Sequence, residues 1–144
     1  MIITYKNREL IKHDNIKYDH DAKFRGLCYD YLEKSIQIKV NNLYYKKTLY
    51  LNFYNVIFFD VKNCEFWEKY DEISCFYIEE NQTKLEELKN EYISNYESYK
   101  FSSFDINVDF FTFGIEIKSG DYVTIICEKI EYEEKDLIED SKAD

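Results

Sequence analysis

The segment SIQIKVN, residues 35–41, decides the fold class of this chain. Its apolar residues Ile36, Ile38 and Val40 alternate strictly with polar ones. Successive side chains of a β-strand point to opposite faces, so this spacing predicts a strand with one buried and one solvated face. Residues 48–53 repeat the alternation, and the segment NNLYYKK between the two can form the turn of an antiparallel hairpin.

The neighbouring segments predict more strands. FRGLCYDY, residues 24–31, precedes the hairpin as a third strand, and three successive strands favour a meander. Within residues 104–117 the apolar alternation changes parity between Phe110 and Phe111, which predicts a bulge or bend. The turn sequence KSGD then leads into YVTIICEKIEY, residues 122–132, which we expect to return as one partner strand.

One substantial helix is predicted near residues 83–98. Asn81 or Thr83 can cap it, and glutamates in its first turn suit the positive end of the helix dipole. The expected fold is therefore α+β: mainly antiparallel β, as a small sandwich or a curled meander sheet, with this one helix. The apolar residues that recur at helical spacing, and that should cover a sheet, are Leu85, Leu88, Tyr92, Ile93 and Tyr96.

Length and composition predict a single domain over residues 1–132. A chain of 144 residues with 19% aromatic residues can bury one core. Residues 133–144 are charged and poorly patterned, and we expect a frayed acidic tail there. No apolar run approaches the roughly 20 residues that span a bilayer, and the start lacks a signal-peptide pattern. The sequence thus predicts a cytoplasmic protein.

Acidic charge is concentrated in the later part of the chain. Residues 1–50 carry ten Lys/Arg and six Asp/Glu, a local charge of +4. Because the net charge of the chain is −10, residues 51–144 carry a charge of −14. An acidic field repels nucleic acid and anionic membranes and attracts basic partners. We therefore expect no nucleic-acid partner, no membrane partner and a basic protein partner.

The segment KHDNIKYDHDA, residues 12–22, contains both histidines of the chain and is the strongest candidate for a metal site. A metal-dependent hydrolase that uses His13 and His20 is the enzymatic alternative. Catalytic metal sites draw ligands from several rigid elements, whereas these residues share one stretch and no third histidine exists. We interpret the segment as a polar connection and expect no metal, no cofactor, no catalytic residues and no enzyme.

The four cysteines, Cys28, Cys64, Cys75 and Cys127, have no zinc-site spacing. Without a signal peptide we expect reduced and mostly buried thiols.

A segment around the single tryptophan is the best candidate for partner binding. It combines aromatic residues with several carboxylates outside the clear strands, which is a mixture typical of protein interfaces. The alternative is that the aromatic residues simply close the end of a sheet. The predicted partner-binding residues are Trp67, Glu68, Tyr70, Asp71, Glu72, Glu79 and Glu80.

Several short motifs over residues 18–132 resemble a known group. They are His20-Asp21-Ala22, the strand end with Leu51, Phe53 and Val56, Trp67, and the closing sequence EKIEY. With the alternating strands, they resemble small, largely uncharacterised bacterial β-rich proteins that include immunity proteins of polymorphic toxin systems. The resemblance implies a non-enzymatic acidic binder that neutralises a basic toxin domain. The alternative is an unassigned regulatory or structural interaction module.

Overall fold

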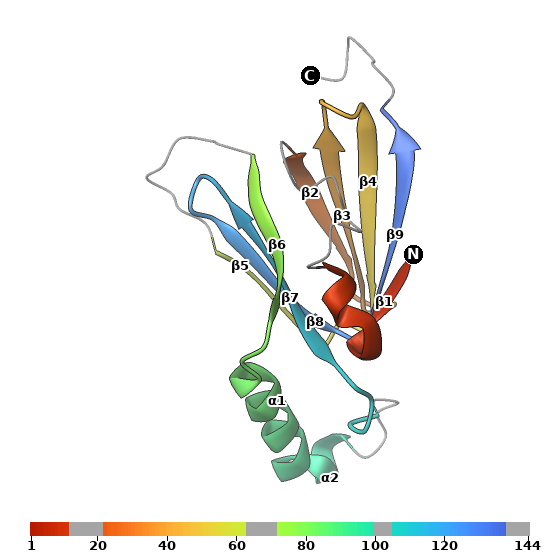
Figure 1. Cartoon of the computed structure of the whole chain (residues 1–144). Helices are drawn as coiled ribbons and strands as arrows, with labels where there is room; N and C mark the ends of the chain where they lie inside the picture. Colours follow the sequence, from red (N-terminus) through yellow and green to blue (C-terminus); the bar gives the residue numbers. More distant parts are fainter. Residues whose placement is uncertain (12–21, 63–71, 100–104, 138–144) are drawn as a thin grey trace.

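Two antiparallel sheets make up most of the structure, a computed structural model that describes residues 1–11, 22–62, 72–99 and 105–137 (Figure 1). The first sheet has the strand order β1-β9-β4-β3-β2 and the second β5-β8-β7-β6. The strands of the first sheet are β1 (Ile2–Thr4), β9 (Lys129–Asp136), β4 (Lys47–Tyr54), β3 (Ser35–Asn42) and β2 (Ala22–Asp30); those of the second are β5 (Phe58–Lys62), β8 (Tyr122–Cys127), β7 (Phe111–Ile117) and β6 (Ile73–Glu79).

The predicted meander is confirmed in the first sheet. Strands β2, β3 and β4 are successive antiparallel neighbours, and Ile38 lies opposite Leu51. Ile36, Ile38 and Val40 are all buried, whereas the polar residues between them are exposed. The alternation in the sequence therefore gives the correct register and the correct inner face of β3.

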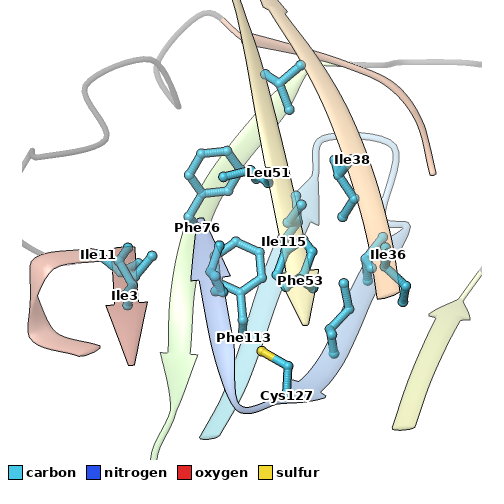
Figure 2. Packing of buried hydrophobic residues seen from close by; sticks show 14 of the residues in the cluster. Ile3, Ile11, Ile36, Ile38, Leu51, Phe53, Phe76, Phe113, Ile115 and Cys127 are labelled. Carbon is cyan, nitrogen blue, oxygen red and sulfur yellow. The ribbon is translucent and has the colours of Figure 1, made fainter. Parts of the chain in front are cut away.

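The core lies between the two sheets, which form a small sandwich. Phe113 of β7 packs against Phe53 of the first sheet, with ring centroids 5.2 Å apart, and against Phe76 of β6 at 5.7 Å (Figure 2). Ile3 and Ile11, from β1 and the 3-10 helix η1 (Tyr5–Ile11), are buried in the same cluster. The mainly antiparallel α+β fold class is thus confirmed.

The hairpin predicted at the KSGD turn is confirmed, because β8 pairs with β7, but residues 122–132 form two strands and the prediction of one returning strand is wrong. Strand β8 pairs with β5 and β7 in the second sheet, whereas β9 pairs with β1 and β4 in the first. Glu128 separates them, and its backbone N–H donates to the carbonyl of Tyr54, 3.2 Å away. The chain passes from one sheet to the other at Glu128, and the residues Cys127 and Ile130 on either side of it are both buried.

The predicted strand over residues 104–110 is also wrong where the structure describes it. Asp105 accepts hydrogen bonds from the backbone N–H of Asn107 and of Val108, which forms a turn, and β7 begins only at Phe111. Phe110 and Phe111 are buried in different clusters. The change of parity in the sequence therefore marks the start of a strand rather than a bulge within one.

The predicted helix is confirmed, with a break. Helix α1 (Thr83–Ser94) is followed by α2 (Tyr96–Tyr99), and the Asn95 backbone and side-chain N–H groups both donate to the Glu91 carbonyl. Gln82 precedes the first turn without a side-chain cap, although Asn81 accepts a hydrogen bond from the Thr83 backbone.

Only part of the predicted apolar stripe of α1 is buried. Leu85 packs against Phe110 and Ile126 on the outer side of the second sheet. Ile93 and Tyr96, in contrast, are 62% and 57% exposed, because both helices extend beyond the end of the sheet (Figure 1).

Strand β9 extends into the segment that was predicted to be a tail. Strand β9 continues to Asp136, opposite Lys47, and the side chains of these two residues form an ion pair. Residues 133–136 are therefore part of the first sheet and do not belong to a frayed tail, while residues 138–144 lie outside the described residues. Among the described residues, no helix is long and apolar enough to cross a membrane.

Candidate functional site

The outer face of the second sheet carries the most distinctive arrangement of polar side chains. Phe76 and Ile78 of β6 point into the core, so Tyr77 between them points outward. The strand register places Tyr77 opposite Gly114 of β7, Gly114 opposite Thr124 of β8, and Thr124 opposite Asp60 of β5. One row of residues therefore crosses all four strands.

The side chain of Tyr77 lies across its neighbouring strand. A β-carbon at Gly114 would lie 2.1 Å from Cζ of Tyr77 and 2.5 Å from its hydroxyl oxygen. Only a glycine leaves room for the ring, which is one reason for a glycine in the middle of a strand. The ring passes over Gly114, and its hydroxyl group hydrogen-bonds the Thr124 side chain on the far strand. Tyr77 is thereby fixed in one orientation.

Two carboxylates, those of Glu79 and Glu116, lie near this ring. Burial raises the pKa of Tyr77 above its ordinary value of 10.0, and the negative charges of Glu116 and Glu79 raise it further. Both glutamates are exposed, and so is Asp60 at the end of the row. We refer to Asp60, Tyr77, Glu79, Glu116 and Thr124 as the Tyr77 face.

Cations already lie over aromatic rings beside the Tyr77 face. The ammonium group of Lys62 lies 5.4 Å from the ring centroid of Tyr122, and that of Lys84 lies 4.8 Å from the centroid of Phe58. Both rings stand on the same outer side of the sheet, since Tyr122 and Phe58 share the parity of Thr124 and Asp60. An aromatic surface with carboxylates favours positively charged side chains.

The structure brings together few of the predicted partner-binding residues. Trp67, Glu68, Tyr70 and Asp71 lie outside the described residues. Glu72 precedes β6 and pairs with Lys118, at 2.7 Å between Oε1 and Nζ. Glu79 ends β6, so the strand separates these two glutamates by about 20 Å. Glu80 lies 3.6 Å from the guanidinium of Arg8, and this ion pair links η1 to the segment between β6 and α1. Of the three predicted residues that the structure describes, only Glu79 belongs to the Tyr77 face.

Sequence reasoning missed Tyr77 and Glu116. Both lie in strands whose apolar pattern drew attention to the inner face, and their proximity depends on the pairing of β6 with β7. The one usable signal was Gly114, because a glycine inside a strand often marks a close approach of another group.

The structure tests the thiol prediction for three of the four cysteines, whereas the predicted segment with both histidines is not described. His13 and His20 lie outside the described residues, and within the described ranges no three His, Cys, Asp or Glu side chains form a group that could hold a metal ion. Cys28, Cys75 and Cys127 are free thiols, and Cys64 lies outside the described residues. The expectation of mostly buried thiols is wrong for the described cysteines, because Cys28 is exposed, Cys75 is half-buried, and only Cys127 is buried.

Comparisons with known proteins do not assign the chain to a family. No protein-family model matches the sequence, and no curated protein matches it.

Proposed function

We propose that this protein is a non-enzymatic acidic binding protein that contacts a basic protein partner through the Tyr77 face. The observation that carries the proposal is the fixed ring of Tyr77 across Gly114, with Glu79 and Glu116 beside it. A rigid aromatic side chain loses little conformational entropy when a partner binds, and such residues often supply most of the binding energy of an interface.

Charge supports the choice of a basic partner. The chain has a net charge of −10, and three carboxylates of the Tyr77 face are exposed. Exposed carboxylates raise the rate at which a positively charged protein associates, and they disfavour acidic competitors. The lysines over Tyr122 and Phe58 illustrate how cations are accommodated on this side of the sheet.

The partner that we propose is a basic toxin domain, with this chain acting as its immunity protein in the cytoplasm. Two features support the proposal: the sequence resemblance to immunity proteins of polymorphic toxin systems, and the acidic charge that a basic toxin requires of its inhibitor. A neutralising protein needs a preformed surface rather than a catalytic centre, and the Tyr77 face is held by the strand pairing itself.

Co-expression tests this function. If the adjacent upstream gene encodes a large secreted protein with a variable C-terminal domain, that domain should arrest growth when expressed alone. Growth should return when this chain is expressed with it. Failure of the chain to restore growth, or an upstream gene for an unrelated housekeeping enzyme, would contradict the immunity function.

Matched variants test the surface. The double variant Glu79→Gln/Glu116→Gln removes two charges beside Tyr77, and we expect the association rate with the toxin domain to fall about tenfold at low salt. The control Glu86→Gln/Glu91→Gln removes two exposed charges from α1 and should change the rate much less. Equal effects of the two variants would show that overall charge, and not the Tyr77 face, determines binding.

A further inference from the structure

Strand β5 is an open edge of the second sheet. The four strands at the edges of the two described sheets are β1, β2, β5 and β6. β1 has only three residues, the registers of β2 and β6 are both interrupted, and a bridge between Lys23 and Glu72 links the ends of those two strands. β5, in contrast, pairs with β8 in regular register from Phe58 to Lys62. Its other edge therefore offers unpaired backbone groups to a further strand.

The charges of β5 have an unusual arrangement for an edge strand. A bulge, a proline or a charge that a further strand would leave unmatched usually prevents pairing at an edge. β5 has a regular register and no proline, and it carries one charge of each sign, on Asp60 and Lys62. Both residues are exposed, and because they are two positions apart they lie on the same face, the outer one. These charges repel some strands and match others.

Apolar side chains are exposed beside this edge. Val61 lies opposite the core residue Val123 and is itself 46% exposed, because no strand covers it on the other side. Two positions earlier on the same face, the ring of Phe59 lies 4.7 Å from that of Tyr29, which in turn contacts the largely exposed ring of Tyr31. The apolar surface thus extends from β5 to the turn after β2. An exposed apolar patch of this kind indicates an interaction site.

We propose that β5 pairs antiparallel with β5 of a second copy of this chain, with the two Val61 residues opposite each other. In this register, Asp60 of each copy lies opposite Lys62 of the partner subunit, on the outer face, and a two-fold axis relates the two ion pairs. Self-pairing centred on Asp60 or on Lys62 would instead place two like charges directly opposite, which is unfavourable. The charges of β5 are therefore complementary to themselves in the one register that also covers Val61.

The dimer joins two four-stranded sheets into one continuous sheet. Because the two-fold axis is perpendicular to that sheet, the Tyr77 faces of both copies lie on the same side. Asp60 takes part in the pairing, whereas Glu79 on β6 and Glu116 on β7 lie away from β5 and stay accessible. Self-association requires no toxin, so its test is separate from that of the proposed function.

Sedimentation equilibrium of the full chain, from micromolar to millimolar concentration, tests the dimer. We expect a monomer–dimer equilibrium. Asp60→Lys places two ammonium groups opposite each other and Lys62→Asp two carboxylates, and symmetry makes each change act twice, so each variant should dimerise at least about tenfold more weakly. A chain that stays monomeric at millimolar concentration, or an Asp60→Lys variant that dimerises like wild type, would overturn the proposal.

Charge exchange tests the register. An equal mixture of Asp60→Lys and Lys62→Asp should form a heterodimer, because opposite charges again face each other in both pairs. The double variant Asp60→Lys/Lys62→Asp keeps the net charge of −10 and should dimerise about as well as wild type. Glu86→Lys, at an exposed position of α1, makes the same charge change as Asp60→Lys and should not weaken dimerisation. If the mixture and the double variant stayed monomeric, the proposed pairing of Asp60 with Lys62 would be wrong.

Discussion

Tyr77 and Gly114 face each other across β6 and β7, and the tyrosine ring fills the space that a β-carbon of residue 114 would need. This contact fixes the side chain at the centre of the Tyr77 face and joins three strands, because the ring reaches Thr124 of β8. Local packing and the proposed binding surface therefore depend on the same glycine.

Gly114→Ala should destabilise the protein. The new methyl group would overlap the Tyr77 ring, so the ring must leave its position or the strands must separate, and we expect a loss of about 1–3 kcal/mol in the free energy of unfolding. Urea denaturation measures the change. Gly26→Ala is the matched control, because a β-carbon there would meet no heavy atom within 4 Å. Equal destabilisation by both substitutions would show that overlap with the Tyr77 ring is not the cause, because replacing a glycine that has an ordinary φ should by itself stabilise the fold slightly.

Tyr77→Phe should reduce the loss of stability at alkaline pH. The folded state holds the pKa of Tyr77 above 10.0, through burial and the charges of Glu116 and Glu79. Above the unfolded pKa, the unfolded state releases this proton first, so stability falls as the pH rises through the folded pKa. The difference in unfolding free energy between wild type and variant, measured from pH 8 to about pH 11, isolates this residue from the other tyrosines. A constant difference over that range would contradict the prediction.

Phe113→Ala should remove much of the stability of the fold. Its buried ring contacts Phe53 and Phe76 and connects the two sheets, so its loss leaves a cavity between them (Figure 2). We expect a cost of about 3–5 kcal/mol in denaturant unfolding. Leu32→Ala, at a turn residue that is 87% exposed, should change stability by less than about 0.5 kcal/mol.

Thiol reagents should distinguish Cys28 from Cys127. Cys28 is exposed on the outer face of the first sheet, whereas Cys127 is fully buried, and burial raises the pKa of its thiol. In the native protein, we expect Cys28 to react within minutes and Cys127 to react only after unfolding. Mass spectrometry of the labelled peptides follows each cysteine separately. Rapid native labelling of Cys127 would mean that the core opens between β8 and β9.

The sequence predicted those parts of the fold, such as the β3–β4 hairpin, that depend on residues close together in the chain. The β3–β4 hairpin needs only alternation and a short turn, and the apolar positions Ile38 and Leu51 lie opposite each other as expected. Residues 122–132 form two strands in different sheets because β8 and β9 pair with different distant strands. The sequence of these residues alone does not show which strands those are.

The candidate site shows the same limit. Glu72, Glu79 and Glu80 are close in sequence, but an extended strand lies between the first and the other two. Glu116 lies near Tyr77 only because β6 and β7 are paired, and spacing along the chain cannot predict this contact. Acidic charge was predictable from composition, whereas its distribution over the two sheets was not.

The position of β9 has a consequence for synthesis of the protein. This strand, near the C-terminus, inserts between β1 at the N-terminus and β4, and it is preceded directly by a strand of the other sheet (Figure 1). The first sheet therefore cannot be completed until the chain up to Asp136 has left the ribosome. Until then, β1 and one edge of β4 lack their partner, which exposes unpaired backbone to other chains. A premature stop before Lys129 should consequently yield an aggregating product rather than a smaller folded domain.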